Sequence, residues 1–185
     1  MKQIIAYTDG SAVVSGANKG RGGYGAFFPD FYGKPKGLHE GFLYTKTGRT
    51  EMHALLSAIN AFDWKTDAAD EHVMLTVYSD SQYVVKAFTD GRLNKWKDNG
   101  WTNSSGKVKN KDLWLRILYA LEQRRYLKLD MIWIKGHQLD KEKNPVAKAY
   151  LMQDPHIVGN AMADILADRW RLGINLKHDL NKDQL

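Results

Sequence analysis

The sequence contains no cysteine among its 185 residues. Disulfide bonds, thiolate metal sites and cysteine nucleophiles are therefore excluded, and any bound metal must be held by oxygen or histidine ligands. No hydrophobic run approaches the length of a membrane span, and the apolar stretch that follows Met1 is too short for a signal peptide. We therefore expect a cytoplasmic protein that has no membrane partner.

Apolar residues make up 43% of the chain and charged residues 26%, a balance that is typical of folded globular proteins. The length suits one domain with its own core, which we place at residues 1–172, followed by a polar tail at residues 173–185. We expect this domain to be monomeric. We expect the tail, and the stretch from Gly136 to about Pro155, to be poorly ordered.

Three strand-like runs come first, and glycine, proline or aspartate turn residues bound each of them: Lys2 to Thr8, Gly22 to Phe28 and roughly Lys36 to Leu43. Their close spacing predicts an antiparallel meander. From Thr50 onward the apolar residues recur three and four positions apart, which predicts an amphipathic helix.

The second half of the chain alternates strands with helices. A strand from His72 to Tyr78 leads into a helix that Ser81 can cap. The remaining predicted elements are a helix from about Lys111 to Arg125, a strand from Leu127 to Ile134 and a helix from about His156 to Arg171. This order predicts an α/β fold in which helices flank a mixed five-stranded sheet, with three antiparallel strands followed by parallel crossovers.

Two acids occupy matching places, because Asp9 and Asp80 each follow a strand-like run. In parallel neighbouring strands these ends meet at one edge of the sheet, where the two carboxylates could share a cation. Alternatively, each aspartate only begins a turn or caps a helix. Glu51 lies at the start of the first helix, where the alternative is a solvated glutamate that complements the helix dipole.

A fourth acid, Asp164, lies in an otherwise apolar stretch of the last predicted helix. A charge close to the core is costly there unless it is paired or bound to a metal. Asp168, one turn further along the helix, competes for the same role.

Basic and aromatic residues concentrate in one segment before residue 111, namely Lys95, Trp96, Lys97, Trp101, Lys107 and Lys109. The formal net charge of +6 is a weak indication of a polyanionic partner. The alternative for this segment is a solvated loop whose tryptophans pack on a neighbouring helix. We expect Trp114 to be a core residue.

Seven short blocks resemble bacterial-type ribonuclease HI and follow that family's order. They are Tyr-Thr-Asp-Gly-Ser at 7–11, Gly-Gly-Tyr-Gly at 22–25, Arg-Thr-Glu-Met at 49–52, Ser-Asp-Ser-Gln-Tyr-Val at 79–84, Lys-Asn-Lys-Asp-Leu-Trp at 109–114, Ile-Lys-Gly-His at 134–137 and Asn-Ala-Met-Ala-Asp-Ile-Leu-Ala at 160–167. The resemblance covers roughly residues 3–172 and implies an RNase H-like fold.

This resemblance implies hydrolysis of the RNA strand of RNA–DNA hybrids by two-metal-ion catalysis, which leaves 5′-phosphate and 3′-hydroxyl ends. The ions would be Mg²⁺, for which Mn²⁺ can substitute. The implied metal ligands are Asp9, Glu51, Asp80 and Asp164, the last chosen over Asp168 because Asp-x-Leu-Ala is how the family's block reads. His137 would be the mobile histidine beside the site, suited to proton transfer or product release.

The resemblance also implies contacts with both strands of a hybrid. The segment from Arg92 to Lys111 resembles the family's basic protrusion, so we expect its lysines and tryptophans to grip the DNA strand. Thr47 and Asn110 resemble members of the family's DNA phosphate pocket. On the RNA side, the candidates are polar and backbone groups of the glycine-rich turn that carries Asn18.

Two departures from the family pattern affect these expectations. Thr47-Gly48-Arg49 is shorter than usual and lacks an asparagine commonly found there, and the interval from His137 to Asp164 is much longer. An insertion at about residues 138–157 therefore lies next to the site as a lid, an extra duplex contact or a partner surface. Two alternatives to a ribonuclease remain: a related two-metal DNA nuclease, and a hybrid-binding module with a decayed site.

Overall fold

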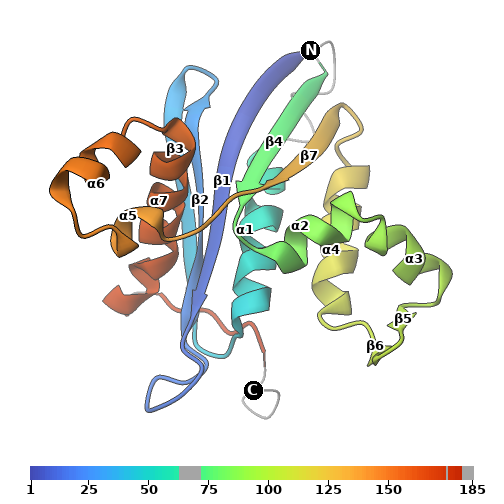
Figure 1. Ribbon diagram of the computed structural model, residues 1–185. Helices are drawn as coiled ribbons and strands as arrows, with labels where there is room; N and C mark the ends of the chain where they lie inside the picture. Colours follow the sequence, from blue (N-terminus) through green and yellow to red (C-terminus); the bar gives the residue numbers. More distant parts are fainter. Residues whose placement is uncertain (63–71, 174, 181–185) are drawn as a thin grey trace.

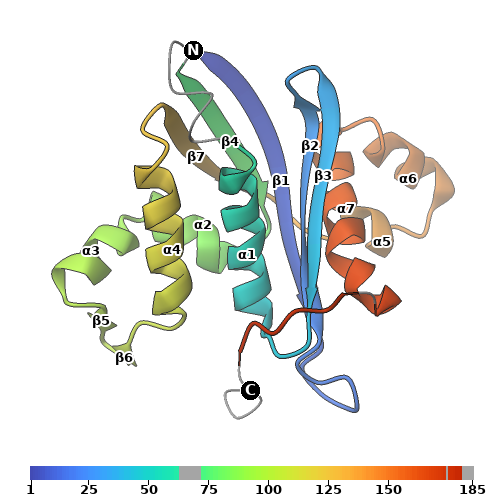
Figure 2. The same ribbon diagram turned by 180° about the vertical axis from the view of Figure 1, so that it is seen from behind.

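The computed structural model describes residues 1–62, 72–173 and 175–180. Within these ranges a mixed five-stranded sheet has the strand order β3-β2-β1-β4-β7. Helices cover both of its faces: α1 (Thr47–Asn60) and α4 (Lys111–Glu122) lie on one, and α7 (Pro155–Ala167) lies on the other (Figure 1 and Figure 2). This arrangement confirms the predicted α/β fold.

The sheet combines an antiparallel flank with parallel crossovers, as predicted. β1 (Lys2–Ala12) pairs antiparallel with β2 (Gly22–Phe31), which pairs antiparallel with β3 (Lys34–Phe42). β4 (Val73–Ser79) lies parallel to β1, and β7 (Leu127–Trp133) lies parallel to β4. Parallel neighbours need long connections, and helices provide them here.

β1 does not stop before Asp9, as the sequence pattern indicated, but continues to Ala12. Its parallel pairing with β4 ends at Thr8 and Ser79, whereas its antiparallel pairing with β2 extends to Ala12 and Gly22. β2 therefore supplies backbone partners after β4 has ended. This explains why the strand runs past the aspartate.

The core lies between the sheet and the α1–α4 layer. Side chains of a strand alternate between its faces, so Ile4 and Ala6 enter this core while Tyr7 faces α7. Trp114 of α4 is fully buried, which confirms its predicted place in the core. Burial of a large apolar side chain stabilises a fold by about 1.5–3 kcal/mol. The core therefore provides a rigid support for the sheet edge described below.

Two shorter helices and a small hairpin fill the interval between β4 and α4. α2 (Gln82–Thr89) is capped as predicted, because the Ser81 hydroxyl oxygen accepts a hydrogen bond from the Val84 amide at 3.3 Å. α3 (Arg92–Asp98) and the hairpin of β5 (Thr102–Asn103) and β6 (Gly106–Lys107) project from the body of the molecule (Figure 1). No helix in the described ranges combines the length and the hydrophobicity needed to cross a bilayer.

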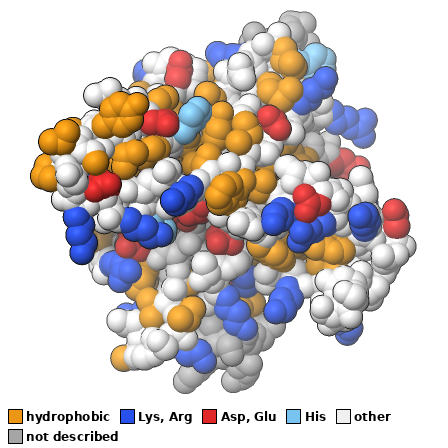
Figure 3. All heavy atoms as spheres, in the orientation of Figure 1, with side chains coloured by type: hydrophobic (Ala, Val, Ile, Leu, Met, Phe, Trp, Pro, Cys, Tyr) orange, Lys and Arg blue, Asp and Glu red, His pale blue; other side chains and the backbone are white. Residues whose placement is uncertain are grey.

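The insertion contains two helices where we expected a poorly ordered stretch, so that expectation was wrong. They are α5 (Gln138–Lys141) and α6 (Pro145–Leu151). The Asn144 side-chain oxygen caps α6 by accepting from the Val146 amide at 2.9 Å, and proline occupies the first helical position, where it needs no amide partner. Figure 3 shows hydrophobic side chains gathered on the surface over α6, where Val146, Tyr150 and Met152 are exposed.

The polar tail is also more structured than we expected. The chain ends α7 in a 3₁₀ turn (Asp168–Leu172), and Lys177 then forms a parallel bridge with Phe42 at the end of β3. The Lys177 amide donates to the Gly41 carbonyl at 2.8 Å, and the Leu180 amide donates to the Tyr44 carbonyl at 2.8 Å. Residues 174 and 181–185 of the predicted tail lie outside the described residues.

Candidate active site

The ends of two parallel strands bring the first pair of acids together. Thr8 and Ser79 form the last pair in the β1–β4 register, so Asp9 and Asp80 follow at neighbouring positions on one edge of the sheet. Burial is the main cause of the raised pKa of Asp9, and the nearby negative charge of Asp80 is the next largest cause. The structure therefore brings these two acids to the same edge of the sheet.

Glu51 joins this edge because α1 packs unusually close to β1. A Cβ on Gly10 would overlap the backbone nitrogen of Glu51, so only glycine permits this approach. The Ser81 hydroxyl donates a 2.6 Å hydrogen bond to Glu51 Oε2, which ties the carboxylate to the start of α2. Glu51 is therefore held against the site, and it is not the solvated helix-terminal acid of the alternative interpretation.

Asp164 enters from the opposite layer, on α7. Its charge raises the pKa of the Asp9 carboxyl, whereas Asp168 accepts from the Ser11 hydroxyl at 2.7 Å and pairs with Arg171 at 3.0 Å. Of these two acids, Asp164 is thus the one that contacts the predicted set. Both acids line an open cleft of about 360 Å³, together with Asp9, Thr47 and His137 among others.

All four carboxylates have a raised pKa, namely those of Asp9, Glu51, Asp80 and Asp164. Asp9 is 5% exposed, and burial followed by the charges of Asp80 and Asp164 raises its pKa well above the ordinary value. Burial also raises the pKa of Glu51 to about 7, against the opposing hydrogen bond from Ser81. Burial is likewise the main cause of the raised pKa values of Asp80 and Asp164.

This set of donors fits a hard divalent cation. Partly buried carboxylates that lie close together repel one another when ionised, and a bound cation relieves the repulsion. Gly136 closes the edge, because a Cβ there would overlap the Asp80 carboxylate. The geometry thus explains two glycines of the sequence as well as the four acids.

His137 lies beside the acids at the start of α5, in a left-handed backbone conformation with φ of 54°. Its Nδ1 is 3.4 Å from Asp164 Oδ2 and 3.5 Å from Asp140 Oδ2. Ligand atoms of these three residues all lie within 4.8 Å of one another. The sequence analysis missed Asp140. The available signal was its position three residues after His137.

The basic segment divides into an outer and an inner set of side chains. Lys95, Lys97, Lys107 and Lys109 are exposed. Trp96 and Trp101 are partly buried and pack against the core, and the Trp96 ring lies 5.6 Å from the Trp114 ring. The lysines therefore remain available to a ligand. The two tryptophans are partly covered by packing against the core, as the alternative interpretation proposed.

The remaining predicted contacts lie near the same end of the sheet. Asn18 is exposed in the β1–β2 turn, where its carbonyl accepts from the Arg21 amide at 3.0 Å. Thr47 begins α1, and a Cβ on the next residue, Gly48, would lie 3.8 Å from the Asn110 side-chain nitrogen. The first turn of α1 therefore lies close to Asn110 at the start of α4, while Thr47 itself also lines the cleft beside Asp9.

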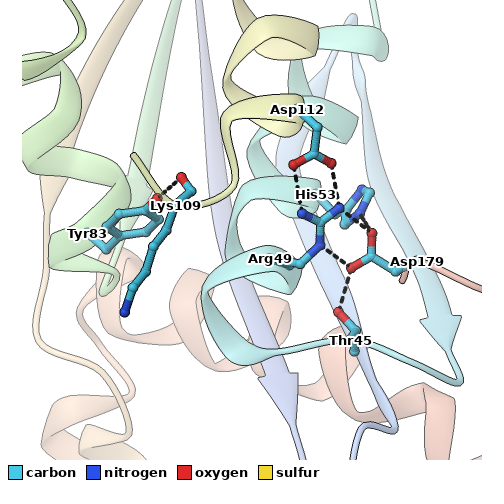
Figure 4. A network of polar contacts seen from close by, with 7 residues as sticks. All are labelled: Thr45, Arg49, His53, Tyr83, Lys109, Asp112 and Asp179. Atoms are coloured by element: carbon cyan, nitrogen blue, oxygen red, sulfur yellow. Dashed lines mark hydrogen bonds and ion pairs between the residues drawn. The ribbon is translucent and has the colours of Figure 1, made fainter. Parts of the chain in front are cut away.

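An ion-pair network beside these residues was not predicted. It consists of Thr45, Arg49, His53, Asp112 and Asp179, which we call the Arg49 network (Figure 4). Asp179 belongs to the tail that we expected to be poorly ordered, so sequence reasoning gave no reason to connect it with α1. The available signal was the position of Arg49 three residues before Met52 and seven before Leu56, on the apolar side of the predicted helix.

Comparisons with known proteins identify the family of this chain. The RNase H family profile matches residues 1–171. Ribonuclease HI of Haemophilus influenzae is 37% identical over 142 residues, which is 76% of this chain and 82% of the relative. Ribonuclease H of Syntrophus aciditrophicus is 34% identical over 164 residues, which is 83% of this chain and 86% of the relative.

Solved structures support the same fold. LC9-RNase H1, described as a type 1 RNase H with the type 2 active-site motif, has a TM-score of 0.68 at 20% identity and covers 93% of this chain and 73% of its own. The RNase H domain of prototype foamy virus has a TM-score of 0.64 at 24% identity and covers 93% and 96%. The profile match and the bacterial relatives together confirm the resemblance in the sequence: this chain belongs to the RNase H family.

Proposed function

We propose that this protein is an endoribonuclease that hydrolyses the RNA strand of RNA–DNA hybrids and leaves 5′-phosphate and 3′-hydroxyl ends. The observation that carries the proposal is the convergence of Asp9, Glu51, Asp80 and Asp164 from three separate elements and one loop onto one edge of the sheet. Membership of the RNase H family supports the choice of substrate. LC11-RNase H1, which shares this fold with a TM-score of 0.56 at 20% identity, has been solved in complex with an RNA/DNA hybrid.

The four carboxylates would hold two Mg²⁺ ions, for which Mn²⁺ can substitute. When bound, such ions supply a nucleophilic water and stabilise the charge that develops on the phosphoryl and leaving oxygens. Asp9 is the ligand best suited to be shared by both ions, because it is the most buried of the four and its Oδ1 accepts from the Gly10 amide at 2.6 Å. No protein nucleophile is required, which fits a chain without cysteine.

His137 would transfer a proton or assist product release. Its side chain is 48% exposed, and its Nδ1 faces the carboxylates of Asp164 and Asp140. The ring therefore reaches the acids while remaining accessible to solvent, as a proton shuttle requires. We expect His137→Ala to lower kcat by roughly a hundredfold. A complete loss of activity with a loss of Mg²⁺ affinity would instead make it a metal ligand.

The substrate would lie across the sheet edge and the basic segment. The exposed lysines of α3 and the hairpin would contact DNA phosphates, Thr47 and Asn110 would bind one DNA phosphate, and Asn18 would face the RNA strand. Proteins detect RNA in a duplex through its 2′-hydroxyls and phosphates more than through its sequence, so we expect little sequence preference.

A gel assay with three labelled duplexes of one sequence tests the proposal. With Mg²⁺ we expect cleavage of the RNA strand of the hybrid, and no cleavage of the DNA duplex, the RNA duplex or an EDTA control. Cleavage of the DNA duplex would favour a related DNA nuclease. Binding of the hybrid without cleavage would favour a binding module with a decayed site.

A further inference from the structure

The C-terminal segment places one buried carboxylate against the start of α1. The Asp179 side chain is 2% exposed, and it accepts hydrogen bonds of 2.8 Å from Thr45 Oγ1, from Arg49 Nε and Nη2, and from His53 Nε2 (Figure 4). Burial alone would raise the pKa of Asp179, but the hydrogen bonds from His53 and Arg49 outweigh it and hold the pKa below the ordinary value. Asp179 therefore carries its negative charge at neutral pH.

Arg49 also binds Asp112 and so connects Asp179 to α4. Its Nη1 and Nη2 donate to the two oxygens of Asp112 at 2.9 Å and 2.7 Å, while Nε and Nη2 hold Asp179. A guanidinium group has five N–H donors in a fixed plane, so two carboxylates that grip both of its edges define its orientation. The Asp112 side chain is 58% exposed, which makes Asp179 the buried and more firmly held of the two partners.

The network joins the two helix starts that carry Thr47 and Asn110, and a Cβ on Gly48 in the first turn of α1 would lie 3.8 Å from the Asn110 side-chain nitrogen. Thr47 lies two positions before Arg49 in the first turn of α1, and Asn110 lies two positions before Asp112 as the N-terminal cap of α4. Asn110 has a left-handed φ of 56°, and its preceding carbonyl, that of Lys109, accepts from the Tyr83 hydroxyl at 3.0 Å. Two attachments therefore hold this loop, one from α2 and one through Arg49.

We propose that Asp179 is a positioning residue for the DNA-strand phosphate pocket formed by Thr47 and Asn110, and that it acts through Arg49 and Asp112. The inference rests on the proposed function, since the pocket has a role only if the protein binds a hybrid. Asp179 does not touch the substrate. Its role is to keep the spacing between the starts of α1 and α4 at the value that one phosphate group requires.

The test measures hybrid binding in EDTA, where cleavage does not interfere. A set of hybrids carries one neutral methylphosphonate each, moved stepwise along the DNA strand. Wild-type protein should lose affinity when the phosphate bound by Thr47 and Asn110 is replaced. We expect Asp179→Asn to weaken binding of the unmodified hybrid by about tenfold, the size of one charge-assisted contact, and to lose nothing further on that particular methylphosphonate hybrid.

Two further variants separate positioning from stability. Thr45→Val removes one donor to Asp179 but keeps its charge, so it should show the same pattern with a smaller change and serves if Asp179→Asn fails to fold. Arg124→Met removes buried hydrogen bonds to the Phe62 and Ala120 carbonyls at the other end of α4, and it should lower stability without changing hybrid affinity.

The outcomes distinguish this inference from the proposed function. If wild-type protein does not bind the hybrid, the proposed function fails. If wild-type protein binds but Asp179→Asn and Thr45→Val bind equally well, or lose affinity by the same factor at every methylphosphonate position, the positioning role is overturned. Equal loss of affinity in Arg124→Met would also overturn it, because general destabilisation would then explain the effect.

Discussion

Arg49 and Glu51 lie two positions apart on the first turns of α1, and each belongs to a different cluster of charged residues. Arg49 belongs to a network in which each carboxylate faces a cationic or hydrogen-bonding partner, and the pKa of Asp179 is lowered although burial opposes this. Glu51 belongs to a set of four neighbouring carboxylates in which three acidic charges raise the pKa of Asp9, and burial raises the pKa of Glu51 to about 7 although the Ser81 hydroxyl donates to it. Charges that are balanced within the protein stabilise the fold, whereas unbalanced ones indicate a ligand that the protein must bind.

Replacing one unbalanced carboxylate should abolish function without harming the fold. We expect Asp9→Asn to lose Mg²⁺-dependent cleavage of the hybrid, because Asp9 lies close enough to the other three acids for each of their charges to raise its pKa. In EDTA the same variant should have a higher free energy of unfolding than wild type, since it removes a buried charge that its neighbours repel. Activity assays and urea unfolding measure the two effects. Near-normal turnover would remove Asp9 from the site.

Replacing a balanced carboxylate should have the opposite effect on stability. We expect Asp179→Asn to lower the free energy of unfolding by about 3 kcal/mol, because Arg49 then remains buried with only the exposed Asp112 as its anionic partner. Asp90→Asn is the matched control, since the Asp90–Arg92 pair is exposed on both sides and should contribute less than about 1 kcal/mol. Equal losses in the two variants would contradict the distinction between buried and exposed pairs.

The pH dependence of stability should reveal the unbalanced set. Glu51 has a folded-state pKa of about 7 against an ordinary value of 4.5, so the folded protein binds more protons than the unfolded chain between these values. In EDTA, stability should therefore fall as the pH rises from 5 to 8, by up to about 3 kcal/mol from this residue. Urea titrations measure the change. Glu51→Gln should show a flatter profile, and saturating Mg²⁺ should oppose the fall, because it binds the ionised carboxylates.

We expect the smallest effect from exposed lysines that have, among the described residues, no carboxylate partner comparable to those of Arg49. Arg49 is neutralised by two carboxylates, whereas Lys95, Lys97, Lys107 and Lys109 are exposed. Replacing these four lysines with glutamine should weaken hybrid binding and flatten the slope of log affinity against log salt by up to about one per lysine. Anisotropy titrations at several salt concentrations measure the slope. An unchanged slope would mean that these lysines do not contact phosphates.

Much of the architecture was predictable because its signals are local. The strands at residues 2, 22, 73 and 127 and the helices at 82 and 111 begin at or within one position of the expected residues. Capping by Ser81 and the burial of Trp114 follow from a hydroxyl at a helix start and an aromatic residue on an apolar stripe. The insertion was misjudged although the Asn144–Pro145 start of α6 is a local signal, whereas the tail was misjudged because it pairs with a distant strand edge.

The candidate site was predictable in part. The matching positions of Asp9 and Asp80 suggested a shared edge, while Glu51 and Asp164 were selected through the family resemblance. Sequence alone did not distinguish Asp164 from Asp168 on physical grounds, since both lie on the same helix one turn apart. The charge of Asp164 acts on Asp9 while Asp168 accepts from Ser11, and this difference depends on how α7 packs against the sheet.

The order of strands and helices, the absence of thiol chemistry and the residue types that can bind a divalent cation were all determined by the sequence itself, because periodicity and side-chain chemistry are local properties. Tertiary structure decided which charges are balanced. Asp179 reaches Arg49 across 130 positions, and hydrogen bonds from His53 and Arg49 lower its pKa, whereas burial between α7 and the sheet raises the pKa of Asp164. Electrostatic energy depends on distance and burial in space, and neither can be read from separation along the chain.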